Sequence, residues 1–501
     1  MTKKSSILKA LFKLHLITPR GLFRLACCFI KEGVTLMAVL RFASRYYPDC
    51  CALVSEGERF TYKQLYDYAL QVTDVLYSEY HVRPHDYVGI LCRNHSASVA
   101  LFTALSRLGV NIRLLNSDMG SEKIEVFLQK WHLNAIVYDE ELQQRCLPAE
   151  MPCESFTLES VCEKVHGGLA GKVKRPRITR GGQISVFTGG SSGKYKEASR
   201  KTGVLQFLPP FLALLKDICI QNYKSVYLSL PFYHGFGLGT LVISMAMGKK
   251  ICLARRFKEE NALEMIANEQ IEVMPTVPAM LARIWQTEGS EEKMKSVKCV
   301  ISGGDRLSKK LLDTTREKLG DVLFNLYGTS EAGFFMMATP QDLSCKDEVT
   351  LGRPITGVEC EVRDMDEKGV GTLWVRSKWA MIGQQNIWQS TGDRVRCDGD
   401  GYFFHENAGK MVVCGGENVY PENVEQVIAQ YPEVVNTKVY PVADETFGFV
   451  LKAQVELAKD SHLTVDELKT WLKPKLARAE MPHEIVFQPI EILSTGKRGV
   501  G

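Results

Sequence analysis

The stretch of this sequence best suited to bind a charged ligand is a loop of small and hydroxyl-bearing residues that carries two lysines. It follows the apolar run 184–187 and reads Thr188-Gly189-Gly190-Ser191-Ser192-Gly193-Lys194-Tyr195-Lys196. Glycine lets the backbone bend so that its N–H groups close around phosphate oxygens, and the lysine ammonium groups neutralise the phosphate charge. A Walker loop needs glycine in place of Thr188 and serine or threonine in place of Tyr195. The segment therefore predicts a polyphosphate-binding loop of a different kind, with a plain linker as the alternative.

Two shorter segments could complete a nucleotide site. The first, Tyr327-Gly328-Thr329-Ser330-Glu331, follows a predicted strand over 322–326. Ligands of open α/β sheets collect at strand ends, and a hydroxyl beside a carboxylate suits a phosphate oxygen and its Mg²⁺. The second, Thr391-Gly392-Asp393, is predicted to form a tight turn whose acid accepts hydrogen bonds from ribose hydroxyls. Taken alone, neither segment separates a nucleotide site from an ordinary strand end or turn.

The elements that must hold these segments alternate between helical and extended patterns. Helix-period segments over 61–77 and 96–108 are interleaved with short apolar runs over 87–92, 111–115 and 135–138. A second set begins at residue 225, and its predicted strands cover 226–230, 251–254, 299–302 and 322–326. Such alternation predicts crossover connections and mostly parallel sheets. We therefore expect an α/β fold whose large N-terminal body contains two α/β subdomains.

Toward the C-terminus the pattern changes twice. Residues 351–402 contain short strands with Asp-Gly turns, which predict a small β-barrel-like unit. Predicted helices over 422–430 and 465–479, among short strands, then indicate a small, mobile α+β C-terminal domain that begins at residue 409. A chain of 501 residues is also too long for one hydrophobic core, which supports a division into domains.

Bulk composition excludes several classes of protein. With 45% hydrophobic and 24% charged residues, the chain is neither disordered nor fibrous. A formal net charge of +4 gives no reason to expect nucleic acid as a partner. The 15 cysteines include no Cys-x-x-Cys spacing, so they predict buried thiols in a reducing cytoplasm, without disulfides or a zinc site.

Residues 1–47 form a basic amphipathic leader with two open interpretations. Up to residue 45 a single acid, Glu32, faces nine basic residues, which are Lys3, Lys4, Lys9, Lys13, Arg20, Arg24, Lys31, Arg41 and Arg45. Interleaved apolar residues allow a helix that lies on an anionic membrane, or an ordinary helix docked on the body with a solvated basic face. No apolar run reaches the roughly 18 residues of a membrane span, and no signal peptide is recognisable. We expect a cytoplasmic protein, with peripheral membrane contact through residues 1–45 left open.

The order and spacing of the chemical segments resemble those of the adenylate-forming (AMP-binding) superfamily, in particular the acyl-CoA synthetases. Two further segments resemble parts of the family's pattern. Pro231-Phe232-Tyr233-His234 resembles the family's gate beside the acyl pocket, and Ser302-Gly303-Gly304 resembles its adenine-facing strand end. Near the C-terminus, Gly415-Gly416-Glu417-Asn418-Val419-Tyr420-Pro421 resembles the start of the mobile domain, and Ser494-Thr495-Gly496-Lys497 the segment of the adenylation lysine. The resemblance begins near residue 48, which implies an AMP-binding domain over 48–408 and a C-terminal domain over 409–501.

The resemblance also implies a role for each matching residue. Thr188, Gly189, Gly190, Ser191, Ser192, Gly193, Lys194 and Lys196 hold the β- and γ-phosphates of ATP. Ser330 touches the α-phosphate, Glu331 binds Mg²⁺, and Asp393 binds ribose. Lys497 contacts the substrate carboxylate and the α-phosphate, and the expected catalytic set is Lys497, His234, Ser330 and Glu331. The nucleotide-binding set is completed by Gly303, Gly304, Asp305, Tyr327, Gly328, Thr329 and Asn407.

Two positions near the expected hinge depart from the family's pattern. Asn407 stands where an arginine is expected to help hold the nucleotide, and Gly409 stands at the hinge acid, although Lys410 could serve there. Because the family rotates its C-terminal domain between two half-reactions, these departures weaken the expectation of full two-step activity.

Three functions are open on this basis. Residues 232–238 contain no acid to pair with a substrate ammonium, which disfavours an amino acid substrate. Phe334-Phe335-Met336-Met337 could line an apolar acyl tunnel, which favours a fatty acid, or form a buried strand. The first function is an ATP- and Mg²⁺-dependent ligase of fatty acid metabolism that activates a fatty or aryl acid as acyl-AMP and transfers it to CoA. The second loads a separate carrier protein, and the third is nucleotide binding without turnover.

Overall fold

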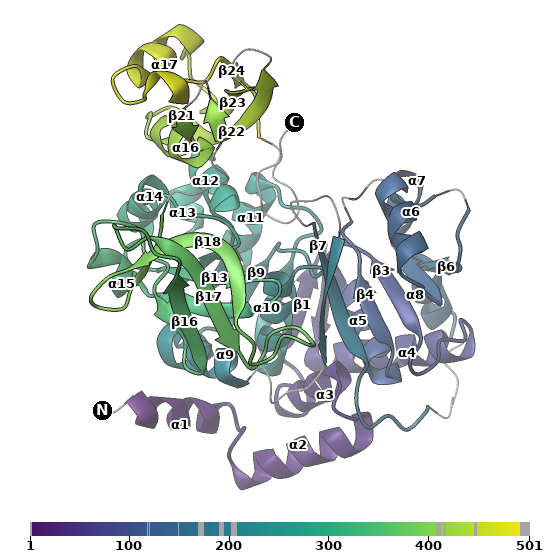
Figure 1. Ribbon diagram of the computed structural model, residues 1–501. Coiled ribbons are helices and arrows are strands. Elements are labelled where there is room, and N and C mark those ends of the chain that lie inside the picture. The colour runs from purple at the N-terminus through teal and green to yellow at the C-terminus, as the bar shows by residue number, and fades with distance from the viewer. Residues whose placement is uncertain are drawn as a thin grey trace.

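The structure is a computed structural model of the chain, and it describes residues 3–117, 119, 121–148, 150–168, 175–189, 195–201, 208–406, 412–414, 417–444 and 448–490. Figure 1 shows a large body of sheets flanked by helices, with a small domain above it and two helices along its lower side. The α/β class, the large N-terminal body and the small C-terminal domain agree with the sequence-based prediction.

Three helices open the chain, where the sequence predicts one basic leader. They are α1 (Lys3–Lys13), α2 (Pro19–Glu32) and α3 (Leu36–Tyr46). Thr18 caps α2 by accepting the Gly21 N–H, and Thr35 caps α3 by accepting the Ala38 N–H, so hydroxyl residues fix both starts. Most of α3 is buried, whereas α1 and α2 lie on the lower side of the body in Figure 1. The leader therefore divides into a core helix and two surface helices.

The first sheet has six strands in the order β6-β5-β3-β4-β7-β8, parallel except for the β7–β8 hairpin. The strands are β3 (Tyr87–Leu91), β4 (Asn111–Leu114), β5 (Ala135–Tyr138), β6 (Glu154–Thr157), β7 (Gln183–Gly189) and β8 (Tyr195–Lys201). Its helices are α4 (Tyr62–Ser78), α5 (Ser96–Leu108), α6 (Ser121–Lys130), α7 (Gln143–Cys146) and α8 (Leu158–His166). Gly109 ends α5 with φ +73°, the left-handed conformation that glycine adopts without steric cost.

The second sheet has nine strands in the order β15-β14-β13-β12-β11-β9-β10-β1-β2. The strands are β1 (Cys51–Ser55), β2 (Glu58–Thr61), β9 (Ser225–Leu228), β10 (Lys250–Leu253), β11 (Val273–Thr276), β12 (Cys299–Gly303), β13 (Leu323–Thr329), β14 (Gly333–Ala338) and β15 (Arg353–Pro354). Its helices are α9 (Leu208–Ala213), α10 (Gly235–Ala246), α11 (Glu259–Glu269), α12 (Pro278–Gln286), α13 (Ser290–Lys293), α14 (Lys309–Leu319) and α15 (Pro340–Ser344). The pairing of β1 with β10, about two hundred residues later in the chain, was not predicted.

Two smaller sheets complete the fold. The predicted β unit is a four-stranded antiparallel sheet of β16 (Val358–Arg363), β17 (Gly371–Ser377), β18 (Gln389–Cys397) and β19 (Phe403–His405). The C-terminal domain contains β20 (Val412–Cys414), β21 (Glu417–Val419), α16 (Pro421–Ala429), β22 (Val434–Asp444), β23 (Gly448–Leu457), α17 (Val465–Leu472) and β24 (Glu484–Phe487). The predicted helix over 465–479 ends at Leu472, because Pro474 has no backbone N–H to donate the next helical hydrogen bond.

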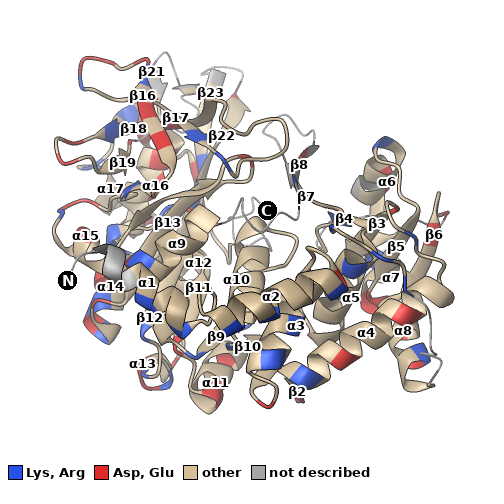
Figure 2. Ribbon diagram, turned by 90° about the horizontal axis from the view of Figure 1, so that it is seen from below, with Lys and Arg blue, Asp and Glu red and all other residues tan. Residues whose placement is uncertain are grey.

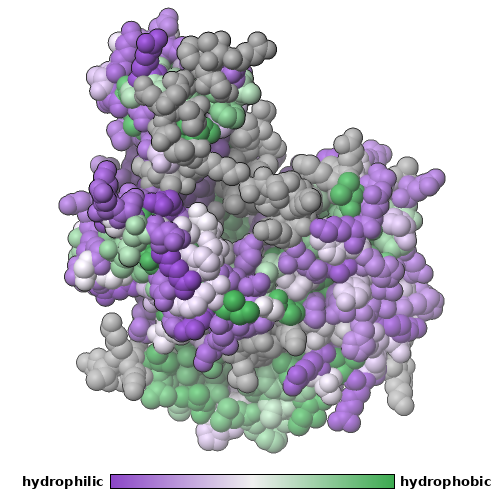
Figure 3. Space-filling view, in the orientation of Figure 1, coloured by the Kyte–Doolittle hydropathy of each residue, from purple (hydrophilic) through white to green (hydrophobic). Residues whose placement is uncertain are grey.

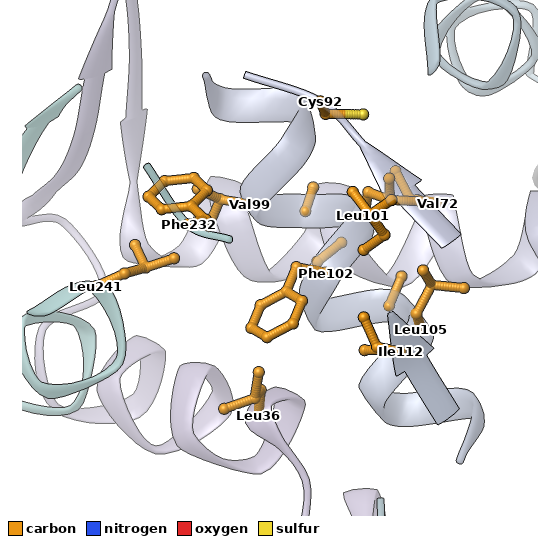
Figure 4. Packing of buried hydrophobic residues seen from close by; sticks show 14 of the residues in the cluster. Leu36, Val72, Cys92, Val99, Leu101, Phe102, Leu105, Ile112, Phe232 and Leu241 are labelled. Atoms are coloured by element: carbon orange, nitrogen blue, oxygen red, sulfur yellow. The ribbon is translucent and has the colours of Figure 1, made fainter. Parts of the chain in front are cut away.

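A buried cluster joins α3 to both halves of the body. Leu36 of α3, Phe102 of α5 and Leu241 of α10 converge in Figure 4, and each is at most 9% exposed. Full burial of such a side chain contributes about 1.5–3 kcal/mol. Because α10 is fixed in this way against α3, its remaining surface can serve as a rigid wall.

Glu32, at the end of α2, is held inside the protein by three donors. Its Oε1 accepts from Arg41 Nη1 at 2.6 Å and from Tyr66 Oη at 2.7 Å, and its Oε2 accepts from Arg107 Nε at 2.7 Å. Burial alone would raise the pKa of Glu32, but the bonds from Tyr66, Arg107 and Arg41 outweigh it and lower the pKa. The single acid of residues 1–45 is therefore turned away from solvent.

The cysteines agree with the prediction only in part. All 15 are free thiols, yet Cys27, Cys50, Cys345 and Cys397 are exposed rather than buried. Among the described residues, no helix has both the length and the apolar character that crossing a bilayer requires.

Candidate active site

A cavity of about 2840 Å³ extends through the body, and its lining runs from α16 of the C-terminal domain to α1 and α2. Its walls come from strand ends and loops that are far apart in sequence, on β12, β13, β18, α10 and α16. The predicted site residues that line it are Gly303, Gly304, Asp305, Tyr327, Gly328, Thr329, Ser330, Glu331, Asp393 and His234. The tertiary fold thus brings together residues of four segments that were predicted separately.

For the predicted phosphate-binding segment, the structure describes only the backbone at its two ends. The backbones of Thr188 and Lys196 pair across the β7–β8 hairpin, as do those of Gly189 and Tyr195. The connection between these strands, with Gly190, Ser191, Ser192, Gly193 and Lys194, lies outside the described residues, as do Asn407, Gly409, Lys410 and Lys497. Strands β7 and β8, which flank the predicted phosphate-binding segment, form an antiparallel pair at the edge of the six-stranded sheet.

Tyr327 and Asp393 form the centre of one wall. Tyr327 Oη donates a hydrogen bond to Asp393 Oδ2, and the tyrosine ring meets the His405 ring edge-on at 5.4 Å between centroids. Burial, followed by the nearby charge of Asp393, raises the pKa of Tyr327 well above its ordinary value. Tyr327 therefore remains a neutral donor that fixes the carboxylate of Asp393. His405 was not predicted, since nothing in its sequence surroundings distinguishes it from a strand residue.

The segment Thr391-Gly392-Asp393 is not a tight turn, which corrects the prediction. It lies within β18, where the pairing with β17 is irregular and Gly392 has φ +81°. Thr391 Oγ1 accepts the Asp393 N–H at 3.1 Å, so the hydroxyl holds the backbone of the acid. A bulged strand projects a side chain more rigidly than a free turn, because its neighbours remain in the ladder.

The turn that carries Ser330 and Glu331 joins β13 to β14. Gly328 is required here, because a Cβ atom at this position would lie 2.4 Å from the Gly333 carbonyl oxygen. Thr329 Oγ1 accepts the Ala332 N–H at 3.0 Å, which closes the turn. Within the part of the chain that the structure describes, the Glu331 carboxylate makes no hydrogen bond or ion pair closer than 4 Å, so its oxygens are available to a cation.

Arg200 of β8 supports this turn, a role that was not predicted, because the local sequence shows only a basic residue four positions after Lys196. Its Nη2 donates to the carbonyl oxygens of Ser330 at 2.5 Å and Glu331 at 3.3 Å, and its Nε to Trp379 O at 3.4 Å. Burial lowers the pKa of Arg200 to about 10, although the charge of Glu331 opposes the shift. Arg200 is therefore cationic at neutral pH, and it connects the phosphate-loop hairpin to the Glu331 turn.

Replacement of Arg200 by methionine is expected to lower the rate of pyrophosphate exchange by about tenfold or more. The variant loses hydrogen bonds from a charged donor, each worth about 1.5–3 kcal/mol, and the Glu331 turn loses its support. The Mg²⁺ concentration for half-maximal rate should rise as well, since Glu331 is displaced. Arg200→Lys should recover part of both effects, and an unchanged Mg²⁺ dependence in Arg200→Met would limit Arg200 to fold stability.

The strand end that is predicted to face adenine lies at a close contact between β12 and β13. A Cβ atom at Gly303 would lie 3.1 Å from Leu326 O, and Gly304 has φ +85°. Asp305 Oδ1 accepts the Arg306 N–H at 2.7 Å, which orders the start of the connection to α14. The two glycines therefore leave room beside the strand end for a flat ligand.

The apolar part of the cavity begins at His234, the residue that precedes α10. The rings of Tyr233 and His234 lie 4.7 Å apart, and beyond them the cavity is lined by α9 and by one face of α10. Gly235 and Gly239 of α10 line the cavity, and a Cβ atom at either would meet no atom within 4 Å. Of the stretch 334–337, Phe334 lines the cavity, whereas Phe335, Met336 and Met337 are buried in β14. The buried-strand interpretation holds for those three residues.

Two cations of the body hold the C-terminal domain. Lys310 Nζ donates to the carbonyl oxygens of Tyr431, Pro432 and Val434 at 3.0, 3.1 and 3.0 Å. On α12, Arg283 Nη2 donates to Ile490 O at 2.6 Å and lies 3.4 Å from Glu456 Oε1. Glu456 is the one side-chain acceptor in this group, and the others are backbone carbonyl oxygens. The hydrogen bonds between body and C-terminal domain therefore depend more on where the domain's backbone lies than on its side chains.

Comparison with known proteins identifies the fold and the family. The chain is 24% identical over 473 residues to a 2-succinylbenzoate–CoA ligase of Bacillus mycoides, covering 88% of this chain and 92% of the relative. Among solved structures, an anthranilate CoA ligase in complex with anthranoyl-AMP has a TM-score of 0.77 at 19% identity and covers 93% of this chain and 95% of its own. The o-succinylbenzoate coenzyme A synthetase of Bacillus subtilis with ATP and magnesium has a TM-score of 0.72 at 22% identity, over 92% of this chain and 97% of its own.

Two family matches follow the division of the fold into body and C-terminal domain. Residues 40–383 match the AMP-binding enzymes, and residues 423–497 match the AMP-binding enzyme C-terminal domain. The first match covers well over half of the chain. It includes the residues of β12 and β13 that line the cavity. This chain therefore belongs to the family of AMP-binding enzymes, as the order of its motifs predicts, and it is an AMP-forming ligase.

Proposed function

We propose that this protein activates an apolar carboxylic acid with ATP, releases pyrophosphate, and transfers the acyl group from acyl-AMP to CoA. One observation carries the proposal: a single cavity joins the residues suited to a nucleotide, from Tyr327 to Glu331 and at Asp393, to the apolar wall of α9 and α10. The names of the relative and of the two structural neighbours, all of them CoA ligases or synthetases, support CoA as the acceptor. A carrier protein as acceptor has no comparable support.

The residues of the cavity fit Mg²⁺ and a nucleotide. Mg²⁺ usually binds one or two carboxylates together with substrate phosphates, and Glu331 offers one carboxylate toward the cavity. Among the described residues, no group of three or more acids, histidines or cysteines could hold a metal alone, so the phosphates must supply further ligands. When bound, Mg²⁺ would neutralise phosphate charge. Ser330 contacts the α-phosphate, Asp393 the ribose, and Gly303, Gly304 and Asp305 lie beside the adenine.

The chain's own groups have to orient and neutralise rather than react. A carboxylate is a poor nucleophile that a triphosphate repels, so the rate depends on alignment and on charge stabilisation. Tyr327 holds the Asp393 carboxylate and Arg200 holds the Glu331 turn, while the loop over 188–196 encloses the β- and γ-phosphates and Lys497 bridges the acid and the α-phosphate. We assign these steps to an AMP-binding domain over 48–408 and a C-terminal domain over 409–501.

The apolar wall favours a fatty acid over a small polar acid. Beyond His234 the cavity continues along Phe236, Leu238, Val242 and Ile243 of α10, and along Phe211 and Leu214 beside α9. Apolar surface of this length is suited to an alkyl chain, which loses water contact along its whole length. An aryl acid, as the relatives' names suggest, would occupy only the part of the cavity next to His234.

Replacement of Gly239 by phenylalanine tests this assignment. The new ring enters open space in the cavity, so exchange supported by palmitate should fall by about 10–200-fold, the range over which apolar pockets discriminate. Exchange supported by benzoate or butyrate should remain within about twofold. Gly399→Phe is the matched control, because Gly399 is exposed in a turn with no atom near its Cβ position. If wild-type protein activates aryl acids but no fatty acid, the fatty acid assignment is wrong and the ligase assignment stands.

A further inference from the structure

The outward face of α1 and α2 is apolar although it lies on the surface. Six large apolar side chains between residues 8 and 30 are exposed, and these are Leu8, Phe12, Ile17, Leu22, Phe23 and Ile30. Phe23 is 69% exposed and Ile30 is 76% exposed, and in Figure 3 hydrophobic residues cover the lower side of the molecule. Contiguous patches of this kind mark sites that another surface covers. We call this set the α1–α2 face.

Helix α2 is amphipathic, but the side that it exposes is mainly apolar. Gly21 and Cys28 are buried against the body, while Leu22, Phe23, Ala26 and Ile30 point away from it. A surface helix of a globular protein normally turns its apolar stripe toward the core and its polar residues toward water. Protein covers one side of α2, so a second apolar environment is expected on the other.

Within the described part of α1 and α2, every exposed charged residue beside the α1–α2 face is basic. The exposed charged residues of α1 and α2 are Lys9, Lys13, Arg20 and Lys31, and residues 7–31 contain no acid. Glu32 is bonded inward to Arg41 and Arg107, so it does not offset this charge. Figure 2, from below, shows the blue of Lys and Arg along α1 and α2. Exposed apolar side chains among lysine and arginine are the features of a helix that lies in an anionic lipid interface.

We propose that the α1–α2 face docks on an anionic membrane and that the acyl cavity opens into this docked surface. The opening of the acyl cavity into the docked surface is inferred from the residues that line the cavity. Ile17 and Leu22 line the cavity and are also 38% and 52% exposed, so the cavity reaches the surface at the connection between α1 and α2. From there Leu25, Phe29, Val39 and Phe42 continue the lining toward α10.

An entrance at this place would receive a lipid-soluble acid directly from the bilayer. The C-terminal domain stands on the opposite side of the body in Figure 1, so the water-soluble nucleotide and CoA would reach the site from the other end of the cavity. This step rests on the proposed function, since it requires a fatty acid as substrate. Membrane docking itself does not, because it follows from the α1–α2 face alone.

Flotation of the full chain with lipid vesicles tests the docking. At 0.15 M salt the protein should float with vesicles of phosphatidylcholine and phosphatidylglycerol, bind vesicles of phosphatidylcholine alone at least tenfold less, and dissociate as salt rises. The double variant Phe23→Glu/Ile30→Glu should lose at least tenfold in binding, because neither side chain lines the cavity but both face outward. Val126→Glu/Met365→Glu is the matched control, since these residues are 59% and 62% exposed elsewhere.

Activity measurements separate this proposal from the proposed function. The Phe23→Glu/Ile30→Glu variant should keep wild-type exchange with octanoate in solution and lose at least fivefold with palmitate supplied in anionic vesicles. Equal flotation of wild type and variant, or no flotation of wild type, overturns the docking. A wild-type dimer that the variant converts to monomers, without vesicle binding, also overturns it and assigns the face to a second copy of the chain. Vesicle binding by a protein that activates no fatty acid supports the docking and rejects the fatty acid substrate.

Discussion

Replacement of Lys497 by alanine should lower the rate of acyl-adenylate formation by about 10²–10³-fold, which corresponds to roughly 2.7–4 kcal/mol of lost transition-state stabilisation. The reaction brings a carboxylate against a triphosphate, and a cation that bridges the two is the group that most directly offsets their repulsion. Lys497 is assigned to this position by its place in Ser494-Thr495-Gly496-Lys497. Pyrophosphate exchange with the best acid measures the adenylation step alone.

The second half-reaction provides the internal control for Lys497. Transfer of the acyl group from chemically prepared acyl-adenylate to CoA contains no triphosphate, so Lys497→Ala should slow it by less than tenfold. Lys459→Ala, an exposed lysine in the turn after β23, should leave both rates unchanged. An unchanged exchange rate in Lys497→Ala would remove Lys497 from the mechanism without affecting the family assignment.

Replacement of Asp393 by asparagine should raise the KM for ATP by about 10–100-fold. The variant keeps the shape of the side chain but loses its charge, and a hydrogen bond to a charged group contributes about 1.5–3 kcal/mol. Both the bond from Tyr327 Oη and the expected bonds from the ribose hydroxyls weaken. Initial rates of exchange over a range of ATP concentrations give the KM, and the KM for the acid should change little because the acyl wall is on α10.

Tyr327→Phe separates the two parts of the Asp393 effect. This variant removes the donor that fixes the carboxylate and leaves the carboxylate in place, so its KM for ATP should rise less than that of Asp393→Asn. In the double variant the effects should be less than additive, since the residues are in direct contact. Fully additive effects would show that Asp393 binds the nucleotide independently of Tyr327, contrary to the geometry.

Local signals were sufficient for much of the fold. Strand β5 (Ala135–Tyr138) and helix α5 (Ser96–Leu108) have the predicted bounds, because an apolar run and a 3.6-residue period are properties of neighbouring residues. The chemical motifs could be found for the same reason. The residues that shape one loop must be close in sequence, as the glycine and the hydroxyls are in Tyr327-Gly328-Thr329-Ser330-Glu331. The order of several such loops along the chain was enough to predict the family.

The tertiary structure decided what depends on residues far apart in the chain. Arg200 supports the Glu331 turn across 131 positions, β1 pairs with β10 instead of the first sheet, and Thr391-Gly392-Asp393 is held in β18 by its partner strand. None of these contacts has a local periodicity, since strand pairing and side-chain hydrogen bonds are fixed by packing of the whole chain. The sequence by itself determined the order of the family's motifs, and from them it predicts which residues bind a nucleotide and an acid. Only packing decided that the described ones among them share one cavity, and that this cavity is also lined by exposed residues of an apolar, basic pair of helices.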